Sequence, residues 1–148
     1  MPAYPLNQYS PLSLAGVQTP PPAVVGYEDR PYDYVYEPPN GQLSANQFLN
    51  PDTLSIYPDA DFLAFGYYIS FASGLFQVQF IDSTGYELSS GMMRSTAIST
   101  VASDPTVFSP AHPFPAGGQI KVIIQDLSGA TNTIQLVFKG VKRFRQRQ

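Results

Sequence analysis

Large apolar residues alternate with small or polar ones in the second half of the chain, and this two-residue period restricts the fold more than any other feature. The clearest stretches are Phe76–Phe80, Ile120–Ile124 and Ile134–Phe138. Successive side chains of a β-strand point to opposite faces, so each stretch predicts a strand with one buried face. No part of the chain shows a convincing helical repeat.

Residues 62–81 contain no charged side chain, and a stretch of 20 residues is long enough to span a bilayer. However, the odd-numbered positions of residues 63–71 are large and apolar, whereas the even-numbered ones are mostly small. After the turn, the even-numbered Phe76, Val78 and Phe80 are large and apolar and alternate with glutamines. We therefore predict two strands joined by a turn at Ala72–Gly74, and no membrane span. The buried face of the first strand is expected to carry Leu63, Phe65, Tyr67, Ile69 and Phe71.

Turn signals follow several of these strands, and two of them belong to a weak internal repeat. Residues 76–85 and 120–129 each consist of a strand that runs into Asp-x-x-Gly. The Asp side chain can accept hydrogen bonds within such a turn, and the Gly can adopt a positive φ. The repeat therefore indicates either two equivalent hairpins of a pseudo-symmetric sandwich or two unrelated turns with the same chemistry.

Several short strands within about a hundred residues favour a single antiparallel β-sandwich, of jelly-roll-like or immunoglobulin-like topology. We place this domain at residues 43–144, followed by a basic C-terminal end at 145–148. Residues 102–118 contain four prolines and are expected to form a surface loop.

Residues 1–42 differ in composition from the rest of the chain, because they hold nine of the 15 prolines and six of the 10 tyrosines. Proline fixes φ and removes a backbone donor, which predicts an extended N-terminal arm. Its apolar and tyrosine side chains favour docking on a partner over a flexible tail. The expected partner-binding residues are Tyr4, Tyr9, Tyr27, Tyr32, Tyr34 and Tyr36.

Charge is scarce and unevenly placed. Charged residues make up 13% of the chain, against roughly 25% in ordinary domains, which indicates a surface partly covered by neighbours. Five of the eight Lys and Arg residues lie in the last ten, and four acids lie within residues 28–37. The basic end can contact a neighbouring subunit's acidic arm, contact nucleic acid phosphates, or remain solvated. The candidate residues are Lys142, Arg143, Arg145 and Arg147.

Residues that carry chemistry are few. The absence of cysteine excludes disulfides and thiolate metal sites. The single histidine, His112, has no acid or nucleophile near it in sequence and is expected to be a loop side chain. Asp59 and Asp61 could begin a calcium site, but calcium needs six to eight ligands. We therefore expect no enzyme, no metal and no cofactor.

The order of motifs in residues 55–145 is familiar. Asp59–Phe62 opens a strand, Phe76–Val78 leads to the first Asp-x-x-Gly turn, and Gly117–Ile120 precedes a closing run at Ile134–Phe144 that ends in Phe-x-Gly-x-Lys-Arg-Phe. This order resembles small structural proteins of tailed bacteriophages, of the minor capsid, collar or tail type.

The resemblance implies a virion component that is assembled in the host cytoplasm, is present in several copies and binds no cofactor. Its partners would be other virion proteins and copies of itself. One alternative is a carbohydrate- or receptor-binding sandwich, which needs an exposed aromatic beside polar groups, such as Tyr67, Tyr68 or Tyr86. An enzyme is the second alternative.

Overall fold

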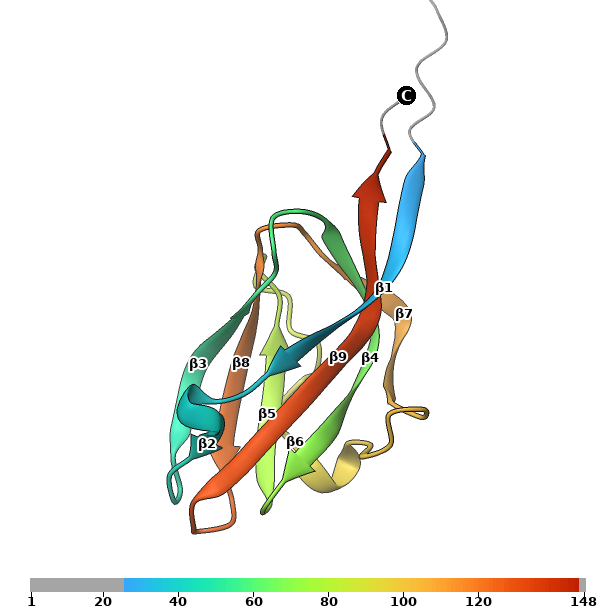
Figure 1. Ribbon diagram of the computed structural model, residues 1–148. Helices are drawn as coiled ribbons and strands as arrows, with labels where there is room; N and C mark the ends of the chain where they lie inside the picture. Colours follow the sequence, from blue (N-terminus) through green and yellow to red (C-terminus); the bar gives the residue numbers. More distant parts are fainter. Residues whose placement is uncertain (1–25, 147–148) are drawn as a thin grey trace, which may run out of the picture.

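The computed structural model describes residues 26–146, which form two antiparallel β-sheets packed face to face (Figure 1). The first sheet contains, in spatial order, β1 (Tyr27–Tyr36), β9 (Asn132–Arg145), β4 (Asp61–Ala72) and β7 (Thr106–Phe114), with the short β2 (Gln42–Leu43) also paired to β9. The second sheet contains β3 (Phe48–Ser55), β8 (Gln119–Asp126), β5 (Phe76–Ile81) and β6 (Met93–Arg94). Short 3-10 turns lie at Pro39–Gly41 and Ser95–Ala97. The predicted all-β sandwich is confirmed.

The strand pairing is nested, which decides between the two predicted topologies. Strand β1 pairs with β9, β3 with β8, β4 with β7, and β5 with β6, all antiparallel. A long hairpin rolled up on itself gives this pairing, which is that of a jelly roll. An immunoglobulin sandwich distributes its strands between the sheets in a different order.

The core lies between the sheets and follows the predicted alternation. All nine inward positions of the three clearest strands are at most 1% exposed. They are Phe76, Val78, Phe80, Ile120, Val122, Ile124, Ile134, Leu136 and Phe138. Phe62, Tyr67 and Phe114 complete this cluster with edge-on and stacked ring contacts. Burial of apolar area at roughly 25 cal/mol per Å² is therefore the main stabilising contribution.

Strand β4 departs from the predicted alternation. The pairing register shifts between Ala64 and Gly66 and again between Ile69 and Phe71. Each extra residue reverses the side chains that follow, so Phe65 and Phe71 are exposed while Tyr67 and Ile69 are buried. The first shift requires a glycine, because a Cβ on Gly66 would collide with the backbone oxygen of Thr106. The turn after β4 and the strand β5 match the prediction.

The predicted domain boundary at residue 42 lies too far along the chain. Residues 27–36 form β1, which pairs along its whole length with β9, so this half of the predicted arm belongs to the sandwich. Pro31 is tolerated because β1 is the outermost strand of its sheet, where a missing N–H breaks no ladder. Residues 1–25 of the predicted arm lie outside the described residues.

The proline-rich segment 102–118 is also more regular than predicted. Its middle forms β7, which is the opposite edge strand of the first sheet. Edge positions again accommodate the prolines. Among residues 26–146 no helix is long and apolar enough to cross a membrane.

The two Asp-x-x-Gly segments form turns as predicted, with Gly85 at φ +90° and Gly129 at φ +72°. They are not equivalent hairpins. Strands β5 and β8 are antiparallel neighbours, so their turns lie at opposite ends of the second sheet. The first turn leads to β6 in the same sheet, and the second leads to β9 in the other sheet.

A two-stranded ribbon extends beyond the rest of the sandwich (Figure 1). Strand β4 pairs with β9 only as far as Arg143, whereas β1 continues to pair as far as Arg145. One further hydrogen bond joins the N–H of Gln146 to the oxygen of Gly26 at 2.9 Å. We call residues 26–28 and 144–146 the terminal ribbon, and both ends of the described chain lie at its tip.

Candidate functional site

The predicted partner-binding tyrosines fall into different environments. Tyr27 is 58% exposed on the terminal ribbon, and Tyr32 is half-buried. Tyr34 and Tyr36 are buried in the core. Tyr4, Tyr9 and Arg147 lie outside the described residues.

The prediction is wrong for Tyr34 and Tyr36, because both bind within the chain. The hydroxyl of Tyr36 donates to Asp52 on β3 at 2.8 Å, and the hydroxyl of Tyr34 accepts from the N–H of Tyr57 at 3.0 Å. Burial raises the pKa of both phenols. The Tyr36 bond joins β1 to the opposite sheet, and the Tyr34 bond joins β1 to the connection between β3 and β4, so both hydroxyls are engaged within the chain.

The side chain of Lys142 also makes its contacts within the chain. Its side chain is 8% exposed, and its Nζ donates to both carboxylate oxygens of Asp59 at 3.1 and 2.9 Å. The ammonium group lies over the rings of Tyr32 and Tyr57, 4.1 and 4.8 Å from their centroids. Burial disfavours the charge, but the bond to Asp59 and the neighbouring tyrosines outweigh it and raise the pKa of Lys142. The Lys142 ammonium group is therefore engaged within the chain, whereas its role in a subunit contact stays a prediction.

The acidic complement of the basic end lies within the same chain. Antiparallel pairing places residues 28–33 opposite residues 139–144. The Arg143 guanidinium donates two hydrogen bonds to Asp29, at 2.8 and 2.7 Å, and lies over the Tyr27 ring. Asp29, which the sequence left as one possible contact of a neighbouring subunit, is thus already bound to Arg143 within the chain. Among the described candidates, Arg145 remains exposed at the tip of the ribbon.

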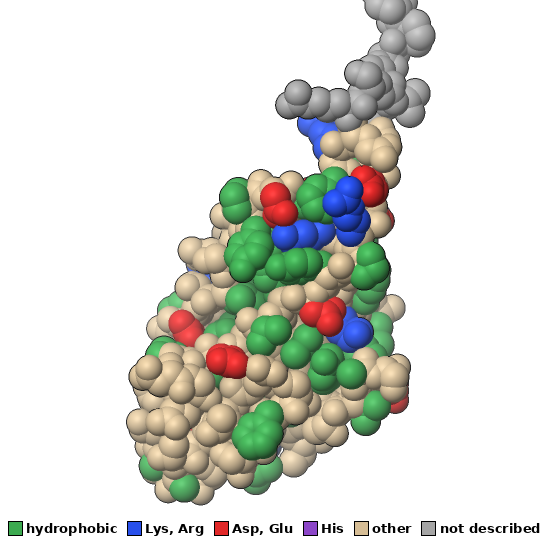
Figure 2. All heavy atoms as spheres, in the orientation of Figure 1, with side chains coloured by type: hydrophobic (Ala, Val, Ile, Leu, Met, Phe, Trp, Pro, Cys, Tyr) green, Lys and Arg blue, Asp and Glu red, His purple; other side chains and the backbone are tan. Residues whose placement is uncertain are grey.

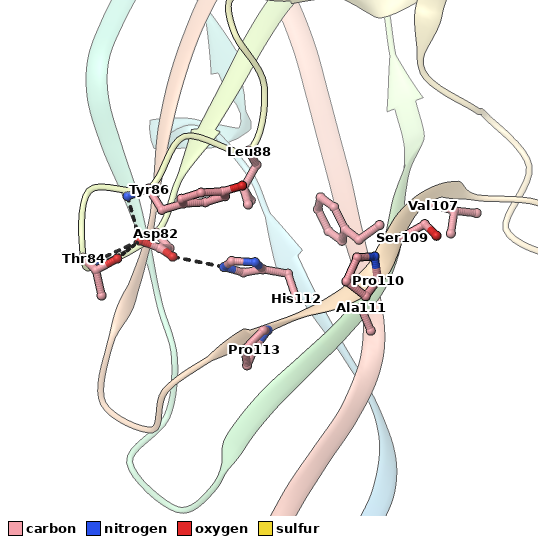
Figure 3. A pocket seen from close by; sticks show the side chains of 11 residues that line it. Asp82, Thr84, Tyr86, Leu88, Val107, Ser109, Pro110, Ala111, His112 and Pro113 are labelled. Atoms are coloured by element: carbon pink, nitrogen blue, oxygen red, sulfur yellow. Dashed lines mark hydrogen bonds and ion pairs between the residues drawn. The ribbon is translucent and has the colours of Figure 1, made fainter.

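A second region contains Tyr86, one of the three aromatics considered for a carbohydrate site, and is a hollow of about 560 Å³ between two segments of the chain. Residues 82–88, which follow β5, form one side, and residues 107–113 of β7 form the other (Figure 3). We call it the Tyr86 hollow. Its lining includes apolar side chains, such as Leu88 and Val107, and side chains that carry hydroxyl groups, such as Thr84 and Ser109.

Asp82 organises one wall of the Tyr86 hollow. Its Oδ1 accepts from the N–H and hydroxyl of Thr84, at 2.9 and 2.6 Å, and from the N–H of Tyr86 at 3.0 Å. Its Oδ2 lies 3.0 Å from Nε2 of His112 (Figure 3). Burial disfavours the carboxylate, but these bonds outweigh it, and the pKa of Asp82 is lowered. Asp82 is therefore ionised at neutral pH, so Nε2 of His112 must donate.

His112 is not the isolated loop residue that the sequence predicted. It lies on β7, stacks on Tyr86 with ring centroids 5.9 Å apart, and meets the edge of Phe114 at 4.8 Å. Its acidic partner is 30 residues away, and only the approach of the β5–β6 loop to β7 brings the two together. The repeated Asp-x-x-Gly turn marked Asp82, but no local signal links it to His112.

The aspartate pair considered as a calcium site is used otherwise. Asp59 binds Lys142, and Oδ1 of Asp61 accepts from the N–H of Ala116 at 2.8 Å. Within residues 26–146 no three or more His, Cys, Asp or Glu side chains gather closely enough to hold a metal ion.

Comparison of the chain with protein-family models, with curated proteins and with solved structures found no significant match. The candidate functions below therefore depend on the geometry of this chain.

Proposed function

We propose that the chain is a non-enzymatic structural protein that assembles with copies of itself, as a component of a virion. In this proposal the jelly roll is a rigid body, and the proline-rich residues 1–25 form the link to a neighbouring subunit. Tyr4 and Tyr9 are the anchoring side chains of that link.

The observation that supports this proposal most is the terminal ribbon. It carries Gly26, the first residue that the structure describes, beyond the body of the sandwich (Figure 1). A segment of 25 residues reaches at most about 85 Å when extended. Because that reach exceeds the size of one small domain, such a segment can cross to an adjacent subunit.

The outer face of the first sheet supplies a surface on which such a segment could dock. Large apolar side chains on its strands are exposed, among them Val35 at 48%, Phe65 at 45%, Phe71 at 55% and Val107 at 65%. Figure 2 shows further apolar side chains on this face, with most of its Lys and Arg side chains toward the ribbon and acidic side chains also across its middle. Exposed apolar side chains that lie together are typical of protein contacts.

Fold analogy adds modest support. Jelly rolls are frequent in viral capsid proteins, but the same architecture also occurs in lectins and cupins. A fold by itself does not assign a function, so the proposal depends on the ribbon and the outer face.

The test compares the full chain with a variant that starts at Gly26. Sedimentation velocity over a range of concentrations should show that the full chain self-associates and that the shortened chain does not. Both should unfold in one cooperative thermal transition, because Gly26 and everything after it is retained.

A full-length variant with Tyr4→Ala and Tyr9→Ala should associate more weakly than the parent, whereas Phe48→Ala, which changes an exposed aromatic on β3, should not. Equal monomeric behaviour of the full and shortened chains at every concentration would refute self-assembly through this segment.

A further inference from the structure

We propose that the Tyr86 hollow binds a neutral saccharide, a role separate from the assembly function. Three features of the hollow carry this inference: an exposed aromatic platform, a polar wall held in place by hydrogen bonds, and the absence of cationic side chains from its lining.

The platform is the ring of Tyr86, which is 62% exposed even though it belongs to a structured turn. Its backbone N–H donates to Asp82, and one face of its ring stacks on His112 with 13° between the planes, which orients the phenol. A fixed, exposed phenol offers an apolar face and a polar edge. Pyranose rings have the complementary character, with C–H groups on a face and hydroxyls around the rim.

The polar wall has a defined geometry. The Asp82–His112 pair lies at the base of the hollow, with side chains 10% and 19% exposed, and it is ionised on the aspartate side. The exposed Ser109 adds a hydroxyl from β7 (Figure 3). Pro110 and Pro113 restrict the backbone on either side of His112, so these groups need little ordering on binding.

The charge of the hollow selects against acidic ligands. Its lining contains the carboxylate of Asp82 but no Lys or Arg. A phosphate, sulfate or sugar carboxylate would therefore be repelled by Asp82 without compensation from a cation. The volume of about 560 Å³ lies within the usual range of small-molecule sites. A neutral mono- or disaccharide satisfies these conditions.

The test uses amide NMR spectra of the full chain titrated with glucose, galactose, mannose, N-acetylglucosamine, lactose and 3′-sialyllactose. At least one neutral sugar should shift the amides of residues 84–88 and 107–113 in a saturable way. Lactose and 3′-sialyllactose form a matched pair that differs in charge, and the sialylated sugar should bind at least tenfold more weakly.

Tyr86→Ala should abolish the shifts, Tyr86→Phe should retain them, and Phe48→Ala, which alters a similarly exposed aromatic on β3, should leave them unchanged. No saturable shift with any neutral sugar at 20 mM would overturn the inference, as would shifts that persist in Tyr86→Ala. Sedimentation of the same variants separates the two proposals, because loss of self-association in Tyr86→Ala would make the hollow a subunit contact and also overturn the inference.

Discussion

The turns at Asp82 and Asp126 begin with the same local chemistry and end in different roles. In both, Oδ1 accepts from the N–H and the hydroxyl of the residue two positions later, Thr84 in one and Ser128 in the other. In both, the glycine that follows has a positive φ. The two turns differ in which groups contact the other carboxylate oxygen, Oδ2, of each aspartate.

Asp126 is satisfied entirely by the framework. It is 1% exposed and also accepts from the N–H groups of Asn46 and Gly129 and from the amide of Asn132. It therefore ties together three segments at one end of the sandwich. Asp82 instead directs Oδ2 toward His112 in the Tyr86 hollow. The local sequence determines the turn. The residue that contacts the turn in the folded chain determines whether the aspartate stabilises the framework or belongs to a surface site.

The largest expected effect is at Asp126. Asp126→Ala removes an acceptor that is 1% exposed and leaves the buried amide of Asn132 and the backbone donors of Asn46, Ser128 and Gly129 without it, which should lower the free energy of unfolding by about 3–5 kcal/mol. Urea denaturation at pH 7 measures this change. Asp104→Ala, in an exposed loop, is the control and should change stability by less than about 0.5 kcal/mol. A similar effect of both substitutions would contradict the assigned role of Asp126.

The second largest difference between the two turns is expected in the loss of stability at low pH. Burial opposes ionisation at both sites, but the hydrogen bonds outweigh it and lower both pKa values. A folded pKa below the unfolded value of about 3.9 gives stability that is present above pH 4 and is lost as the pH falls further. Asp126→Asn should therefore flatten the loss of stability between pH 4 and pH 2 more than Asp82→Asn does. Urea titrations at several pH values test this order, and an equal slope in both variants would contradict it.

Asp82→Ala should be milder at pH 7. Its donors on Thr84 and Tyr86 lie at the surface, where water can replace the carboxylate. We expect a loss of about 1–2 kcal/mol in the free energy of unfolding. Its amide spectrum should change within residues 82–88 and around His112 while the signals of the core strands stay in place. A loss as large as that of Asp126→Ala would remove the distinction between the two turns.

The smallest expected effect is a coupling energy. A double-mutant cycle of Asp82→Ala with His112→Ala should give about 0.5–1 kcal/mol, because the pair is partly hydrated. The matched cycle of Asp126→Ala with Asn132→Ala should give about 1–2 kcal/mol, since that pair is buried. A larger coupling energy for Asp82–His112 than for Asp126–Asn132 would contradict the view that the buried pair contributes more to stability.

The parts of the fold that the sequence predicted are those encoded locally. The alternation at Phe76–Phe80 and Ile120–Ile124 identified buried faces, because a regular strand needs no information from its partners. The reversal at Gly66 was missed, because a bulge is defined by the register with neighbouring strands. Strand β1 was missed because the prolines around it suggested an arm, although an edge strand tolerates them.

The candidate sites show the same division. The concentration of opposite charges at residues 28–37 and 139–147 was correctly noticed, but its meaning depended on which strands pair. Antiparallel pairing of β1 with β9 turned an expected contact between subunits into the Arg143–Asp29 ion pair within the chain. His112 gave no signal, because its partner is determined only by the approach of a loop to an edge strand.

The terminal ribbon also determines how the domain would respond to tension. If residues 1–25 are held by another subunit, the load enters β1 at Gly26 and runs along the strand toward Tyr34 and Tyr36, which are fixed in the core. All ten residue pairs between β1 and β9 then resist together, in shear. A force that separates the two chain ends would instead open the same ladder one pair at a time from the tip. A subunit tethered through its N-terminal end would thus bear more load than one stretched between its two ends, so the same ribbon is strong in one direction and weak in the other.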